Sequence, residues 1–122
     1  MIAVMHRSLY VFIFLLLVAA LTQPCWAHAI LMDSTPKANS VVKGPDFSIN
    51  LRFNVRIDAG RSRVRLVAPD GAVRKLIVDA QPKLDTLQTR VSGLTPGAYK
   101  LEWQVLASDG HITSGEIPFT VN

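Results

Sequence analysis

The sequence has 122 residues, of which 49% are hydrophobic and 18% charged, with a net charge of +4 and one cysteine. This length supports one domain with a modest core, and the charge is only mildly basic. A single cysteine excludes an internal disulfide and a thiolate-rich metal site.

The first 27 residues have the three parts of a cleavable export signal. A short region with His6 and Arg7 precedes an apolar run over residues 9–21 and a stretch that ends at Ala27. The run is short for a membrane span and no stop-transfer charges flank it, which favours a cleaved signal over a retained anchor. We therefore expect residues 1–27 to be removed and the protein to be periplasmic.

Cleavage after Ala27 would make His28 the first residue of a mature domain, 28–122, and would remove Cys25 with the signal. The α-amine and imidazole of a terminal histidine can together close a chelate ring on Cu(II). Cleavage after Ala29 also fits the preference for small residues and would discard His28. The cleavage site therefore decides whether this pair of donors exists.

Beyond residue 46, apolar and polar residues alternate with a period of two, which predicts β-strands. The alternation covers 47–57, 99–105 and 117–121, and further strands are expected at 61–68, 72–78 and 84–91. The Asp70-Gly71 pair favours a tight hairpin between two of them. About seven short strands without a helical stripe predict an all-β, immunoglobulin-like Greek-key sandwich or barrel.

Two aromatic residues have structural interpretations. Residues 94–99, which end in Tyr99, are similar to the tyrosine corner of immunoglobulin-like sandwiches, in which a phenol pins a connection between sheets. The alternative is an ordinary turn that enters a strand. Trp103 alternates with polar neighbours and is expected in the core rather than at a ligand site.

Arginines also alternate along the chain. Arg61, Arg63 and Arg65 would share one face of an extended segment, with Arg52 and Arg56 similarly spaced on the preceding one. Because no aromatic residues interleave with them, a solvated strand face is a better interpretation than nucleic-acid binding.

The segment Ser108-Asp109-Gly110-His111 lies between the last two predicted strands. Asp109 and His111 are two residues apart, so their side chains leave the same face of an extended segment. Such a pair alone is more often a simple hydrogen bond than a metal site. However, His28 and His111 are the only histidines beyond the signal, and with Asp109 they would supply three nitrogens and one oxygen. That set suits tetragonal Cu(II) better than zinc, whose structural sites are usually tetrahedral and rich in cysteine.

Several short motifs occur in order along almost the whole mature chain: His28-Ala29-x-Leu31-x-x-Ser34-Thr35-Pro36, Leu51-x-Phe53, Leu94-x-Pro96-Gly97-x-Tyr99-x-Leu101-x-Trp103, Ser108-Asp109-Gly110-His111, Ser114-Gly115 and Phe119-Thr120-Val121. This ordered set resembles the CopC family of exported copper-binding proteins. The resemblance implies a Greek-key sandwich that holds Cu(II) through His28, Asp109 and His111. It also implies a role in copper resistance or homeostasis, as a carrier or buffer for an inner-membrane copper transporter of the CopD type.

Two departures from the family pattern affect this interpretation. Some members have a methionine-rich loop for Cu(I), whereas Met32 is the only methionine beyond the signal, so we predict a Cu(II)-only protein. Many members have an acidic residue just after the phenylalanine of the second strand, whereas Asn54 follows Phe53 in this chain. The support of the ligands at that point is therefore open.

Two other functions fit part of the pattern. A copper-dependent oxidative enzyme with a histidine-brace site, as in lytic polysaccharide monooxygenases, would use the same terminal histidine. In this chain, however, Asp109 would take up a coordination position, and residues 28–122 leave little room for a glycan-binding face. A β-sandwich interaction module without a metal would need neither histidine. We therefore predict a binding protein rather than an enzyme.

Overall fold

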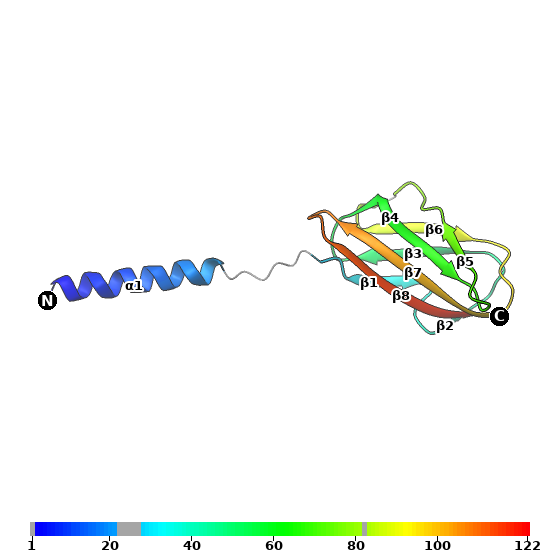
Figure 1. The fold of residues 1–122 in the computed structure, drawn as a ribbon, viewed down its shortest axis with the longest axis horizontal. Coiled ribbons are helices and arrows are strands. Elements are labelled where there is room, and N and C mark those ends of the chain that lie inside the picture. Colours follow the sequence, from blue (N-terminus) through cyan, green and yellow to red (C-terminus); the bar gives the residue numbers. More distant parts are fainter. Residues whose placement is uncertain (1, 22–27, 82) are drawn as a thin grey trace.

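The computed structural model describes residues 2–21, 28–81 and 83–122. Helix α1 (Ile2–Leu21) lies apart from the β-strands, and its described apolar side chains are exposed (Figure 1). No helix in the described part of the chain is both long enough and apolar enough to cross a membrane. The expected cleavage region, residues 22–27, lies outside the described residues.

Eight strands form two sheets (Figure 1). They are β1 (Leu31–Thr35), β2 (Ser40–Val42), β3 (Phe47–Phe53), β4 (Ile57–Val67), β5 (Val73–Leu76), β6 (Thr86–Val91), β7 (Gly97–Ala107) and β8 (Ile112–Val121). One sheet has the order β1-β3-β6 and the other has the order β2-β8-β7-β4-β5. This confirms the predicted all-β immunoglobulin-like sandwich, with eight strands rather than about seven in the described residues, and it excludes the barrel.

The longest pairing joins β7 and β8, which run antiparallel from Gly97 opposite Val121 to Leu106 opposite Ile112. The ladder ends where residues 107–111 turn the chain back. Figure 1 shows this turn at the end of the sandwich where the chain enters β1. The hairpin therefore carries the Asp109 loop to the N-terminal end of the domain.

The prediction of one strand over residues 47–57 is wrong beyond Phe53. Strand β3 ends at Phe53, and Ile57 begins β4, which pairs with β7 in the other sheet. Buried and exposed side chains still alternate through this crossover, because Phe53 and Ile57 both face the same core from different sheets. Alternation reports burial and does not report which sheet a residue joins.

The core lies between the two sheets and contains the inward-facing residues of both. The Phe53 and Trp103 rings meet edge to face there, with centroids 5.2 Å apart, so Trp103 is a core residue as predicted. The Tyr99 hydroxyl donates a hydrogen bond to the Thr95 carbonyl at 2.8 Å. This contact confirms the tyrosine corner, which holds the connection into β7 against the sheet.

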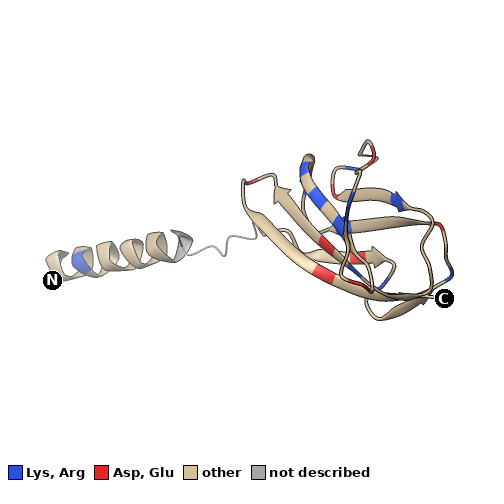
Figure 2. Ribbon diagram, turned by 45° about the vertical axis from the view of Figure 1, so that its right-hand side comes forward, with Lys and Arg blue, Asp and Glu red and all other residues tan. Residues whose placement is uncertain are grey.

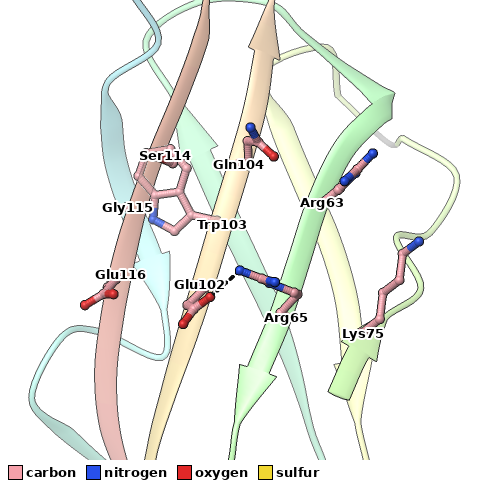
Figure 3. Close-up of a pocket in the computed structure, with 9 residues that line it drawn as sticks. All are labelled: Arg63, Arg65, Lys75, Glu102, Trp103, Gln104, Ser114, Gly115 and Glu116. Carbon is pink, nitrogen blue, oxygen red and sulfur yellow. Dashed lines mark hydrogen bonds and ion pairs between the residues drawn. The ribbon is translucent and has the colours of Figure 1, made fainter. Parts of the chain in front are cut away.

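Arg61, Arg63 and Arg65 lie exposed on the outer face of β4, as predicted, and the ribbon coloured by charge shows basic residues gathered along one strand (Figure 2). Arg63 and Arg65 line an open groove of about 570 Å³ (Figure 3). Arg65 forms an ion pair with Glu102 of β7 at 2.6 Å. Arg52 lies on β3 in the other sheet and does not extend this face. The mixture of charges favours a solvated surface.

Candidate metal centre

The loop between β7 and β8 is built by backbone hydrogen bonds that fix its shape. Ala107 N–H donates to the His111 carbonyl at 2.9 Å, and Gly110 N–H donates to the Ala107 carbonyl at 2.9 Å. Gly110 has φ of 89°, a left-handed conformation that is open to glycine and strained for most other residues. Ser108 N–H also donates to the Arg56 carbonyl at 3.1 Å, which ties the loop to the crossover between β3 and β4.

Asp109 binds His111 through both carboxylate oxygens. Oδ1 accepts the His111 backbone N–H at 3.1 Å, and Oδ2 lies 2.6 Å from His111 Nδ1. A carboxylate can only accept, so Nδ1 carries the proton and Nε2 keeps a free lone pair whenever the imidazole is neutral. The carboxylate thereby fixes both the tautomer and the orientation of the ring, as carboxylates do for metal-binding histidines.

Asp109 is held in its ionised form. Burial of part of the carboxylate raises its pKa, but hydrogen bonds from the His111 backbone and imidazole, together with the His111 charge, outweigh that effect. The pKa of Asp109 is therefore below its ordinary value. The loop presents a negative charge beside His111 throughout the neutral pH range.

His28 reaches this loop from the other end of the chain. Its ring lies 4.9 Å from the His111 ring, centroid to centroid, with the planes inclined at 69°. The next residue, Ala29, is 1% exposed and packs in the core, which anchors the segment that carries His28. The structure thus brings together all three residues predicted as ligands.

His111 contacts both Asp109 and His28, but the three side chains do not converge on one point as metal ligands. Among residues 2–21, 28–81 and 83–122, no three His, Cys, Asp or Glu side chains are grouped as ligands of one ion. Asp109 faces the His111 ring, and the α-amine of His28 would exist only after cleavage. Two imidazoles, one carboxylate and that amine could together hold a metal ion that accepts nitrogen and oxygen ligands.

The sequence left the role of Asn54 open, and the structure gives it a partner, Ile30. Its side-chain oxygen accepts the Ile30 N–H at 2.7 Å, and its own N–H donates to the Ile30 carbonyl at 3.0 Å. Asn54 thus supplies local support directly after β3. Its position inside the predicted strand 47–57 gave no sign of a turn, and its partner 24 residues earlier has no local signature.

Comparison with known proteins finds sequences that are similar to this chain over most of its length. The family model of the CopC domain matches residues 31–122. A copper resistance protein C from Pseudomonas syringae pv. tomato is 32% identical over 127 residues, covering 96% of this chain and 98% of the relative. The copper transport protein CutJ of Bacillus subtilis is 25% identical over 130 residues, which cover 96% of this chain but 22% of that longer protein.

Solved structures agree with the sequence match. The crystal structure of CopC from Methylosinus trichosporium OB3b superposes with a TM-score of 0.70 at 28% identity, covering 78% of this chain and 94% of the other. The family match covers most of the chain, and the fold follows that of a named member. The chain therefore belongs to the CopC family, whose members include copper resistance and copper transport proteins.

Proposed function

We propose that the chain is an exported protein of copper resistance or homeostasis that holds one Cu(II) through His28, Asp109 and His111. The observation that carries the proposal is the contact of the two imidazoles, 4.9 Å apart, beside a carboxylate that already orients one of them. Membership of the CopC family indicates copper as the metal, and the nitrogen and oxygen ligands favour Cu(II) over Cu(I).

Each of the three residues would supply specific donor atoms to the ion. His28 gives its α-amine and imidazole as a chelate, and His111 gives Nε2, because Nδ1 is bound to Asp109. Nδ1 and Nε2 lie on opposite sides of the imidazole, so the Asp109 oxygen must leave Nδ1 and turn toward the ion to become a ligand itself. Nitrogen and carboxylate donors favour Cu(II), whereas Cu(I) prefers thiolates and thioethers, of which residues 28–122 have only Met32.

The surroundings of the site suit transfer of the ion. The His111 side chain is 55% exposed, so a partner can approach it directly. We propose that residues 1–27 direct export and are removed, and that the protein works in the periplasm. In CutJ the matching segment is part of a longer copper transport protein, which supports an inner-membrane transporter of the CopD type as the partner of this chain.

The proposal is tested by Cu(II) titration of the exported protein, followed by electron paramagnetic resonance and by competition with a chelator. His28→Ala or His111→Ala should weaken binding at least about 100-fold, the upper end of the loss caused by removing a residue that merely supports a ligand. The unfolding temperature should change little, because both side chains are exposed.

Asp109→Ala has a matched control within the same chain. Asp70 also precedes a glycine and accepts the N–H two residues on, at 3.0 Å, but has no histidine beside it. Asp70→Ala should therefore leave copper binding intact, while Asp109→Ala weakens it. Equal uptake by the wild type and all three site variants would contradict the proposed site, and copper-dependent oxidation of a glycan would favour the histidine-brace enzyme instead.

A further inference from the structure

The crossover between β3 and β4, residues 54–56, forms hydrogen bonds with both segments that carry the proposed copper ligands. Asn54 forms hydrogen bonds with both backbone polar groups of Ile30, the residue two positions after His28: its Oδ1 accepts the Ile30 N–H, and its own N–H donates to the Ile30 carbonyl. Two residues further along, the Arg56 carbonyl accepts the Ser108 N–H at 3.1 Å and so holds the loop that carries the other ligands. The crossover, residues 54–56, therefore sets the distance between the N-terminal arm (residues 28–30) and the loop of residues 107–111.

We propose that Asn54 is a positioning residue for the copper site, whose side-chain oxygen keeps His28 beside His111. The proposal rests on the function proposed above. Asn54 would not bind the ion itself, because it acts through the backbone of Ile30.

The arm needs such an anchor because little else holds it. His28 would be the terminal residue after cleavage, and chain ends fray unless they are tied down. Strand β1 begins only at Leu31, and its pairing with β3 is irregular between Leu31 and Asp33. Between His28 and the ladder, the described contacts that fix the arm are the burial of Ala29 and the two hydrogen bonds of Asn54.

The side chain of Asn54 contributes separately from its backbone. Without Oδ1, the Ile30 N–H would lose the 2.7 Å acceptor that turns the arm toward the sheet, while the bond from Asn54 N–H to the Ile30 carbonyl would remain. The arm would then be held at one point rather than two. Free rotation of His28 would raise the entropic cost of closing the chelate on the ion.

The experiment uses protein expressed from the full chain, exported, and recovered with His28 as its first residue. Asn54→Ala should weaken Cu(II) binding about three- to tenfold, the effect of losing one hydrogen bond. Asn54→Asp keeps an acceptor at the same place and should bind Cu(II) within about twofold of the wild type. Asn50→Ala, on the adjoining strand β3, removes a side chain with no hydrogen bond among the described residues and should have no effect.

A second readout needs no copper. In the copper-free protein, Asn54→Ala should speed hydrogen exchange at the Ile30 amide and weaken nuclear Overhauser effects between the His28 and His111 rings. Asn54 is exposed, so the fold should survive, and Asn54→Gln, which moves the acceptor by one methylene, gives a second variant with the same expected direction.

The outcomes separate this inference from the function on which it rests. Failure of the wild type to bind Cu(II) in a His28-dependent way would overturn the proposed function before any Asn54 variant is made. Wild-type binding that depends on His28, combined with unchanged affinity and unchanged ring contacts in Asn54→Ala, would overturn the positioning role alone. Weakened affinity with loss of the ring contacts would support it.

Discussion

Asp109 commits both carboxylate oxygens to one residue, His111, and so does two things at once. It fixes which imidazole nitrogen is free, and it places a negative charge beside the ring, which makes that nitrogen a better donor to a cation. Its lowered pKa, which follows from the same contacts, keeps that charge in place in weakly acidic solution. The contribution of this carboxylate to folding is present above the ordinary pKa of aspartate and is lost as the pH falls through its lowered pKa.

The pH dependence of copper binding follows from these assignments. Asp109 keeps its charge because its pKa is lowered, so the loss of binding in acid comes from competition between protons and the metal ion for nitrogen ligands. Affinity for Cu(II) should therefore fall steadily as the pH is lowered from about 8 to about 5. Competition titrations at several pH values measure this dependence, and a constant affinity across the range would argue against nitrogen ligands.

At the scale of elements, the β7–β8 hairpin carries the loop of Asp109 and His111, and its packing depends on one glycine. Trp103 of β7 lies opposite Gly115 of β8, with its large ring turned into the core beneath that residue (Figure 3). A Cβ atom on Gly115 would lie 2.5 Å from Trp103 Cζ2, closer than packed atoms can approach. The ring has no room to retreat, because Phe53 packs against it from the other sheet.

Gly115→Ala should therefore destabilise the domain by about 1–3 kcal/mol, the usual cost of overpacking a core. Gly60→Ala on β4 is the matched control, since its added Cβ would meet nothing closer than Asp58 Oδ1 at 3.4 Å. Urea unfolding of both variants measures the difference. Equal free energies of unfolding for Gly115→Ala and the wild type would show that Trp103 can move, contrary to this account.

The alternating strands and the hairpin strand after Asp70-Gly71 were predictable, whereas β1 and β2 were not. The inward residues of β7 alternate along the whole strand, whereas β1 is an edge strand with little buried surface and β2 has three residues. Both short strands are held by pairing with distant partners, Phe53 for Leu31 and Phe119 for Ser40, which no local pattern reports. Existence of a strand follows from burial, but membership of a sheet follows from the tertiary fold.

The same distinction applies to the site. The contact of Asp109 with His111 follows from a spacing of two residues and is a local property. The approach of His28 to His111 spans most of the domain and is expected from the histidine count and the family resemblance, not from any local pattern. The sequence marks Asn54 as a departure from the family pattern, but its bond to Ile30 is visible only in the structure.

At the scale of the whole molecule, the proposed function would link export and metal binding through one peptide bond. While residue 27 is attached, the His28 nitrogen belongs to an amide and offers no lone pair to a metal. Removal of residues 1–27 would convert it into an amine and complete the chelate with the imidazole of the same residue. The protein would then gain its copper site at the moment that it leaves the cytoplasmic side.

The proposed function therefore depends on the starting residue of the mature chain, and intact mass spectrometry of the protein recovered after expression identifies it. We expect a start at His28, with Cu(II) binding that is at least about tenfold stronger than that of a chain with one additional residue before His28, because the extension replaces an amine by an amide. The extended chain keeps every side chain, so this comparison isolates the amine. A start at Ile30 would remove both His28 donors and leave only Asp109 and His111. Equal affinity of the extended and native chains would exclude the amine as a ligand, even where His28→Ala abolishes binding.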